Sequence, residues 1–130
     1  MILAIIGSRG FNDVELLNSI LTPRVDLIKK VVSGGANGAD KLGEEWAKEN
    51  KIETEIFYPD WKKYGKRAGF IRNEDIIKNS THVIAFWDGE SRGTNHSIEL
   101  SKKLEKKLKI VLFKKPDSGQ AEEVLGSYGI

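Results

Sequence analysis

Residues 30–40 of the chain read KVVSGGANGAD, which is a short β-branched run, then a loop with three glycines, then the start of an amphipathic stretch. In residues 38–50, Ala39, Leu42, Trp46 and Ala47 fall on one face of a helix. The β-branched run is typical of a buried strand. The stretch therefore predicts a strand, a glycine-rich turn and a helix in immediate succession.

The same alternation continues on both sides of this unit. We expect strands at residues 2–6, 30–33, 53–57, 82–87 and 109–113, and helices at residues 12–21, 38–50, 67–79 and 94–107. Residues 58–66 are expected to be irregular, and residues 121–125 are expected to add a helical turn. Alternating strands and helices favour parallel pairing with right-handed crossovers.

The predicted fold class is therefore α/β: a Rossmann-like, doubly wound, mainly parallel sheet of about five strands with helices on both faces. Residues 53–57 alternate polar and apolar and are expected near a sheet edge, whereas the apolar run 82–87 is expected to be central. We expect one domain over residues 1–130, with residues 114–130 peripheral. Ligands of such sheets bind beyond the carboxyl ends of the strands, so the loops after the first, second and fourth strands matter most.

Composition narrows the function classes. The 130 residues contain no cysteine, which excludes disulfides, a zinc-thiolate site and a cysteine nucleophile. The apolar N-terminus lacks a basic leader and is too short for a membrane span, so we expect a cytoplasmic protein without membrane contact. The net charge of +2 says little about partners, and the lysines at 102–109 form either a solvated helix face or a contact for a phosphate-rich partner. We expect no metal site and no cofactor.

Two glycine-rich loops follow the first two strands. In GSRGF (residues 7–11), Ser8 offers a hydroxyl and Arg9 a planar set of donors suited to phosphate, although an ordinary turn with a surface arginine has the same sequence. In the second loop, the backbone amides of Gly34 and Gly35 at a helix start predict an anion site. Asp40 either caps that helix or contacts the ligand.

Two further elements carry polar groups. Arg72 and Asn73, in RAGFIRN, could hold phosphate and a base edge or ribose; alternatively, Arg72 pairs with Asp75 on an exposed face. Gly93 and Thr94, at the start of the fourth helix, predict a second anion site.

The helix that starts near Thr94 contains two further residues that could take part in catalysis. His96 could act as a general acid or base, but no orienting carboxylate is visible in the sequence. Glu99 is either catalytic or pairs with Lys103 one turn on.

Together, GSRGF, SGGANGAD, RAGFIRN and WDGESRGT resemble the SLOG superfamily over about residues 1–113. That group includes the LOG-type nucleotide phosphoribohydrolases and the DprA/Smf DNA-processing proteins, and the chain is most similar to its short YspA-like, YpsA-related branch. The resemblance implies a nucleotide-binding Rossmann-like domain.

The LOG enzymes cleave the N-glycosidic bond of nucleoside 5′-monophosphates and are typically dimers. Their third-helix arginine corresponds to Arg72. Their PGGxGTxxE motif has a glutamate three residues after the threonine, a position that is Ser97 here, while Glu99 lies five residues after Thr94. Two positions along a helix turn a side chain by about 200°, so the resemblance supports binding better than hydrolysis.

The leading hypothesis is a protein that binds or senses a nucleotide or a nucleotide-derived ligand. The alternatives are a nucleoside-monophosphate glycosidase with Arg72 and Glu99 or Asp40 as catalytic residues, and a DprA-like nucleic-acid-binding protein. We expect Trp61 and Tyr64 to belong to a lid or to packing rather than to a nucleic-acid surface, and Leu100 suggests a homodimer through the third and fourth helices. The expected ligand-binding residues are Gly7, Ser8, Arg9, Gly34, Gly35, Ala36, Gly38, Asp40, Arg72, Asn73, Gly93 and Thr94.

Overall fold

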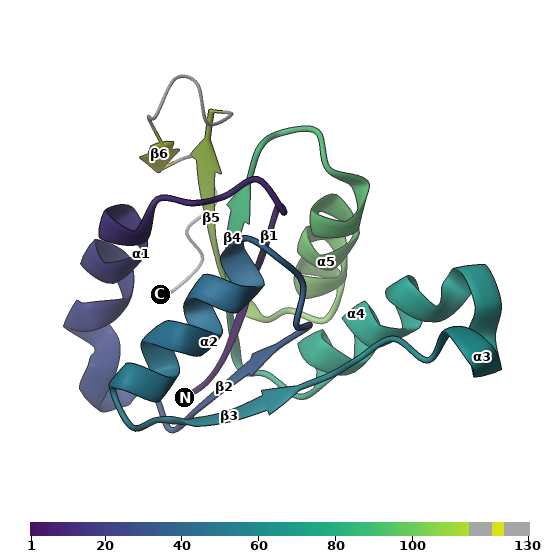
Figure 1. Cartoon of the computed structure of the whole chain (residues 1–130), viewed down its shortest axis with the longest axis horizontal. Coiled ribbons are helices and arrows are strands. Elements are labelled where there is room, and N and C mark those ends of the chain that lie inside the picture. Colours follow the sequence, from purple (N-terminus) through teal and green to yellow (C-terminus); the bar gives the residue numbers. More distant parts are fainter. Residues whose placement is uncertain (115–120, 124–130) are drawn as a thin grey trace.

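The computed structural model describes residues 1–114 and the backbone of Ala121–Glu123. Its strands are β1 (Ile2–Gly7), β2 (Lys30–Ser33), β3 (Glu53–Ile56), β4 (His82–Trp87), β5 (Lys107–Phe113) and β6 (Ala121–Glu123). Its α-helices are α1 (Val14–Leu21), α2 (Ala39–Glu49), α3 (Trp61–Tyr64), α4 (Ala68–Lys78) and α5 (Arg92–Lys103). Two 3-10 helices, Thr22–Leu27 and Gly65–Arg67, complete the described elements (Figure 1).

The strands form one sheet in the order β3-β2-β1-β4-β5-β6. Every pair from β3 to β5 is parallel, and β6 pairs with β5 in the antiparallel direction. This is the predicted Rossmann-like α/β fold, with β3 at an edge and β4 in the middle as expected. The chain runs from β1 outward to β3 and then returns to β4 on the other side of β1, so the strand order reverses between β1 and β4.

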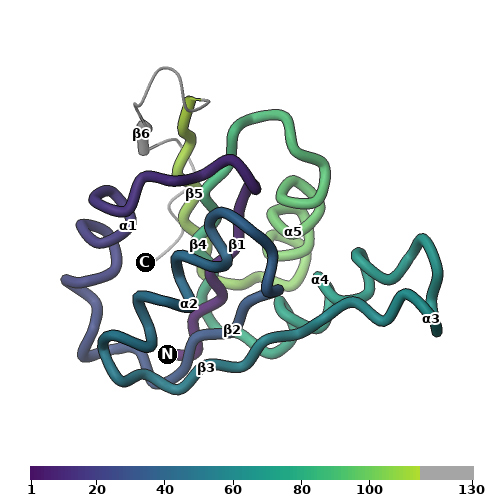
Figure 2. The backbone as a smooth tube through the Cα atoms, in the orientation of Figure 1, coloured from purple at the N-terminus to yellow at the C-terminus, as the bar shows by residue number. Residues whose placement is uncertain are grey.

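The sheet is covered on both faces, because neighbouring residues of each central strand point to opposite sides. Leu3 and Ile5 of β1 pack with α1 and α2, including Trp46, whereas Ala4 and Ile6 pack with α4 and α5. Figure 2 shows the two helix pairs on opposite sides of the sheet. The packing on the second face therefore places α4 and α5 beside the carboxyl end of β1.

Some predicted boundaries are wrong. The fourth predicted helix ends at Lys103 rather than at residue 107, because Glu105 adopts a left-handed backbone with φ 55° and the Lys106 amide donates to the Ser101 carbonyl. Leu104, which directly follows the end of that helix, is exposed. Leu100, which suggested a dimer surface, instead packs partly against the core.

Two other segments also differ from expectation. Residues 58–66 contain the short helix α3, whose N-cap Asp60 accepts a hydrogen bond from the Lys63 amide. At residues 121–125 the predicted helical turn is wrong over Ala121–Glu123, which form β6, and Val124 and Leu125 lie outside the described residues. An available edge on β5 favours strand pairing over an isolated helical turn.

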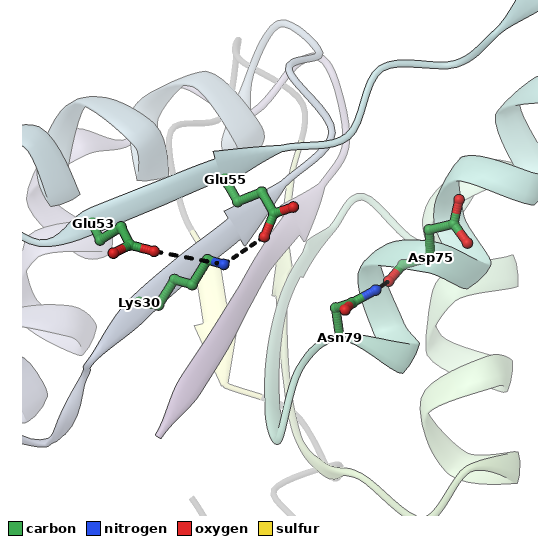
Figure 3. A network of polar contacts seen from close by, with 5 residues as sticks. All are labelled: Lys30, Glu53, Glu55, Asp75 and Asn79. Carbon is green, nitrogen blue, oxygen red and sulfur yellow. Dashed lines mark hydrogen bonds and ion pairs between the residues drawn. The ribbon is translucent and has the colours of Figure 1, made fainter.

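The exposed edge strand β3 is charged. Lys30 of β2 lies with its Nζ 3.6 Å from Glu53 Oε2 and 2.5 Å from Glu55 Oε1 (Figure 3). Charged side chains on an edge strand discourage pairing with another chain. Within the described residues, no helix has the length and apolar character needed to cross a bilayer.

Candidate functional site

A pocket of about 400 Å³ lies at the carboxyl edge of the sheet, beside the ends of β1 and β4. This is the point of strand-order reversal at which open α/β sheets bind their ligands. Its lining comes from all four sequence motifs: Ile6, Gly7, Ser8, Arg9, Gly10, Ala36, Asp40, Arg72, Asn73, Ile76, Asp88, Ser91, Gly93, Thr94 and Ser97. The structure thus assembles at one place four segments that are far apart in the sequence.

Two glycines allow the loops around the pocket to pack closely. A Cβ on Gly7 would lie 2.4 Å from the Phe86 carbonyl oxygen of the neighbouring strand. Gly38 has φ 85°, and a Cβ there would lie 2.4 Å from the Ser8 carbonyl oxygen. Gly38 therefore lets the start of α2 rest on the first loop; it does not line the pocket itself.

The amides of Gly34 and Gly35 are already occupied by carboxylates of the protein. Gly34 N–H donates to Asp40 Oδ2 at 3.1 Å, and Gly35 N–H donates to Glu44 Oε2 at 3.1 Å. Ser33 also donates to Glu44. The expected anion site at these two amides is not free in this structure, and neither glycine lines the pocket.

Asp40 holds the second loop rather than capping a helix. Besides Gly34, it accepts from the Ala36 amide at 3.5 Å, whereas the N-cap of α2 is Gly38, without a side-chain hydrogen bond. The carboxyl group is buried, and this burial raises its pKa to about 7, although the two amides and Arg72 favour the charged form. A carboxyl group with such a pKa in a pocket is a functional-site candidate.

Arg72 reaches from α4 across to the second loop. Its Nη1 donates to the Gly34 carbonyl at 2.7 Å and its Nε donates to Asn73 Oδ1 at 3.1 Å, so the alternative pairing with Asp75 is wrong. Burial lowers the pKa of Arg72, and the like charge of Arg9 lowers it further, against the opposite effect of Asp40. Arg9 and Arg72 therefore present two mutually repelling cations to one pocket.

Asn73 connects α4 to α5. Its Nδ2 lies 3.4 Å from the Gly93 carbonyl and 3.4 Å from His96 Nδ1. His96 also packs against Phe70, with ring centroids 4.5 Å apart, and burial lowers its pKa. The group that orients His96 is thus the side-chain amide of Asn73, whereas from the sequence only a carboxylate was considered in that role.

The loop between β4 and α5 closes the other side of the pocket. Ser8 Oγ lies 2.7 Å from Ser91 Oγ and accepts from the Asp88 amide at 3.1 Å. Asp88 Oδ1 accepts from the amides of Glu90 and Ser91. Burial tends to raise the pKa of Asp88, but these amide hydrogen bonds lower it overall.

The first turn of α5 faces the pocket. The helix begins at Arg92, two residues before the predicted start, and Ser91 is its N-cap but accepts none of its first amides. Ser91 Oγ instead donates to Thr94 Oγ1 at 3.1 Å. Ser91 makes no side-chain cap hydrogen bond to α5, so the first N–H groups of this helix lack a helical partner beside the pocket that Gly93 and Thr94 line.

Glu99 lies away from the pocket. It is exposed, and its Oε1 is 3.9 Å from Lys102 Nζ rather than paired with Lys103 as expected. Ser97, at the position of the LOG glutamate, is buried and lines the pocket. The carboxylates in the lining are Asp40 and Asp88.

Nine of the twelve expected ligand-binding residues line the pocket; Gly34, Gly35 and Gly38 do not. Sequence reasoning did not select Ile6, Gly10, Ile76, Asp88, Ser91 or Ser97. The sequence Asp88-Gly89-Glu90-Ser91 carried a usable signal, since an aspartate followed by glycine is typical of a turn in which the carboxylate accepts nearby amides.

Comparison with known proteins agrees with this architecture. Residues 1–64 match the model of the family described as YspA, cpYpsA-related SLOG. The Gene 61 protein of Mycobacterium phage D29 is 35% identical over 79 residues, which cover 56% of this chain and 63% of that protein, so the chain spans less than two thirds of this relative. No solved structure matches the chain. The match over residues 1–64 places this part of the chain, which carries GSRGF and SGGANGAD, in the YspA, cpYpsA-related SLOG family, in agreement with the resemblance of its motifs.

Proposed function

We propose that the protein binds a nucleotide or nucleotide-derived ligand in the pocket between β1 and β4, with the ligand's phosphate between Arg9, Arg72 and the first turn of α5. The observation that carries this proposal is the convergence of two guanidinium groups and an uncapped helix N-terminus on one pocket. Both features attract anions, since the N-terminus of a helix carries partial positive charge and guanidinium donors match phosphate oxygens.

The charges in the lining favour an anionic ligand. Arg9 and Arg72 repel each other, and an anion placed between them relieves that repulsion. Asp40 has a pKa of about 7 and is therefore partly protonated near neutral pH, which reduces the negative charge beside Arg72. Asp88 keeps its charge, but two backbone amides already satisfy its Oδ1.

The volume and the remaining polar groups suit a small organic phosphate. About 400 Å³ is within the usual range for small-molecule sites. Ser8, Ser91 and Ser97 provide hydroxyls that can bond ribose or phosphate oxygens, while Ile6 and Ile76 provide apolar contact. Family membership supports a nucleotide-related ligand, and we infer that the chain senses or carries it.

The position of the Asp40 carboxyl group in the pocket lining favours the second candidate, a nucleoside-monophosphate glycosidase. Cleavage of an N-glycosidic bond passes through an oxocarbenium-like state that a nearby carboxylate stabilises. Asp40 lines the pocket, whereas Glu99 does not. However, Asp40 Oδ2 accepts the loop amides of Gly34 and Ala36, a role that holds the loop and does not require chemistry.

Isothermal titration calorimetry with a panel of nucleoside mono- and diphosphates and ADP-ribose tests the proposal. Arg72→Ala should weaken binding of the preferred member by about 1.5–3 kcal/mol, the range for a hydrogen bond to a charged group. Arg72→Lys should restore it only in part, because an ammonium has no bidentate geometry. The matched control is Lys78→Ala, which removes an exposed cation from the same helix. No binding by any member at millimolar concentration, or an Arg72→Ala variant that binds normally but melts much earlier, would contradict the proposal.

A further inference from the structure

The exposed aromatic side chains of the described chain are confined to one segment, residues 58–70, which we call the arm. Tyr58 is 71% exposed, Trp61 59%, Tyr64 38% and Phe70 48%. The other large apolar side chains exposed in the described residues, Val14, Leu27 and Leu104, are aliphatic and scattered. Clustered exposed aromatic side chains mark an interaction surface, whereas single exposed residues need no explanation.

The arm also carries a local excess of positive charge. Lys62, Lys63, Lys66 and Arg67 are all exposed, and Asp60 is the single acidic residue of the segment. Four cations and one carboxylate give the arm a formal charge of +3, so the other residues together carry −1 of the chain's +2. No ion pair within the described residues involves any of these four cations.

The fold holds the rings and the cations outward on a projecting element. Figures 1 and 2 show α3 at the end of the molecule farthest from the sheet, joined to the body by α4 and by the chain after β3. Asp60 caps α3, and the Trp61 ring lies across Gly69, where a Cβ would be 3.8 Å from the ring. Lys63 Nζ lies 5.1 Å from the centroid of the Tyr64 ring.

We propose that the arm binds single-stranded nucleic acid, with bases stacking on Trp61, Tyr64 and Tyr58 and with backbone phosphates beside the four cations. Aromatic platforms interleaved with cations are the means by which proteins bind single strands without reading their sequence. Stacking needs unpaired bases, and the four-residue helix α3 offers no recognition helix for the major groove of a duplex. None of these residues lines the pocket, and Trp61 and Tyr64 are exposed, so in this structure they form neither the expected lid nor buried packing. This site is therefore separate from the pocket.

Other partner classes fit the arm less well. The cores of protein–protein interfaces are depleted in lysine, whereas three lysines here alternate with the rings. A helix that lies on a membrane buries a long continuous apolar face, and α3 has four residues of which two are lysines. The combination of charge and aromatic rings therefore favours a single-stranded polyanion with bases.

Fluorescence anisotropy of labelled twelve-residue oligothymidylate and oligoadenylate, titrated with the full chain at several salt concentrations, tests the proposal. The test variants are Trp61→Ala and the double variant Lys62→Gln with Lys63→Gln. Their matched controls are Leu27→Ala, an exposed apolar residue elsewhere, and Lys102→Gln with Lys103→Gln, an equal loss of exposed charge on α5. Circular dichroism checks that every variant is folded.

Trp61→Ala should weaken binding by about 5- to 150-fold, the range for loss of one base–aromatic stack. For wild type, the slope of log K against log salt should be negative, with a magnitude of at most about 3 for the four cations of the arm. The double lysine variant, which loses two of these cations, should reduce that magnitude by about 1.4. Both controls should bind like wild type, and saturating nucleoside monophosphate should not displace the oligonucleotide.

The proposal is overturned if neither oligonucleotide binds, if duplex binds better than single strands, or if nucleoside monophosphate displaces the oligonucleotide. It is likewise overturned if the α5 variant loses as much affinity as the arm variant. Anionic vesicles or a second copy of the chain, held through Trp61 while oligonucleotides are not, would assign the arm to a different partner and refute it.

Discussion

Replacing Asp40 with asparagine should change how the stability of the protein depends on pH. Burial raises the pKa of Asp40 from an ordinary value near 3.8 to about 7. Since a difference of one in pKa corresponds to about 1.4 kcal/mol, this shift corresponds to roughly 4 kcal/mol. Between about pH 4 and pH 7 the folded protein keeps a proton that the unfolded chain has released, so the free energy of unfolding falls as pH rises. The stabilisation is complete below about pH 4 and is lost as pH passes through 7.

The variant should remove this dependence while keeping the loop in place. An asparagine Oδ1 can accept from the Gly34 amide as the carboxylate does, and it has no charge to desolvate. Urea unfolding at unit steps from pH 4 to pH 8, followed by circular dichroism, measures the difference between wild type and Asp40→Asn. We expect that difference to change by up to about 4 kcal/mol over this range, in favour of the variant at the alkaline end.

Asp88→Asn is the matched control, because Asp88 lies on the neighbouring loop and its pKa is shifted the other way. The amides of Ser91 and Glu90 outweigh burial and lower the pKa of Asp88. Its stabilisation is present above the unfolded pKa, near 3.8, and is lost only as pH falls through the lower folded pKa, so the deficit of this variant should stay nearly constant from pH 5 to pH 8. If the difference between wild type and Asp40→Asn stays constant from pH 4 to pH 8, Asp40 ionises normally and the reasoning is refuted.

Three further outcomes are expected. Gly34→Ala should lower nucleotide affinity about tenfold in calorimetry and should also lower the melting temperature. The added methyl group would lie 2.7 Å from Arg72 Nη1 and 2.9 Å from the buried Asp40 Oδ2, so it would displace both groups from the second loop that they hold. Unchanged affinity would show that the placement of Arg72 does not matter. Incubation with adenosine, guanosine and cytidine monophosphates should release no free base by chromatography, and release abolished by Asp40→Asn or by Glu99→Gln would instead establish the enzyme. Light scattering at tens of micromolar should give the mass of a homodimer, and a monomer there would end that expectation.

The fold could be predicted from the sequence because the apolar positions that set its hydrophobic periodicity are the positions buried in the core. The alternation of short apolar runs and amphipathic stretches yields the β1–β5 sheet, and the position of β3 at an edge follows from its alternating glutamates. Helix ends were less predictable. The helix α5 is followed by a left-handed backbone at Glu105, and glutamate is not a residue type that indicates this conformation. β6 depends on a free edge of β5 that a local pattern does not reveal.

The location of the site was predictable, but its internal hydrogen bonds were not. Gly34 and Gly35 resemble an anion-binding loop in sequence, yet Asp40 and Glu44 accept their amides. That outcome depends on the side-chain directions of Asp40 and Glu44 in the first two turns of α2, which residue spacing alone does not determine. Similarly, the partner of Arg72 is a backbone carbonyl 38 positions away rather than a carboxylate on its own helix.

The central place of β1 has a consequence for how the protein reaches its native state. β1 is synthesised before β4, yet it pairs with β4, which lies about 80 residues later in the chain, and the Ser8–Ser91 hydroxyl contact spans 83 positions. A chain emerging from the ribosome up to residue 64 could pair β1 with β2 and β2 with β3, but it would still expose the other edge of β1. The chain loses the entropy of closing a long loop before the stabilising contacts between β1 and β4 form. Such sheets therefore fold slowly and are prone to aggregation until those contacts are made. Binding competence should therefore arise late and in one step, when β4 docks and brings α5 with it.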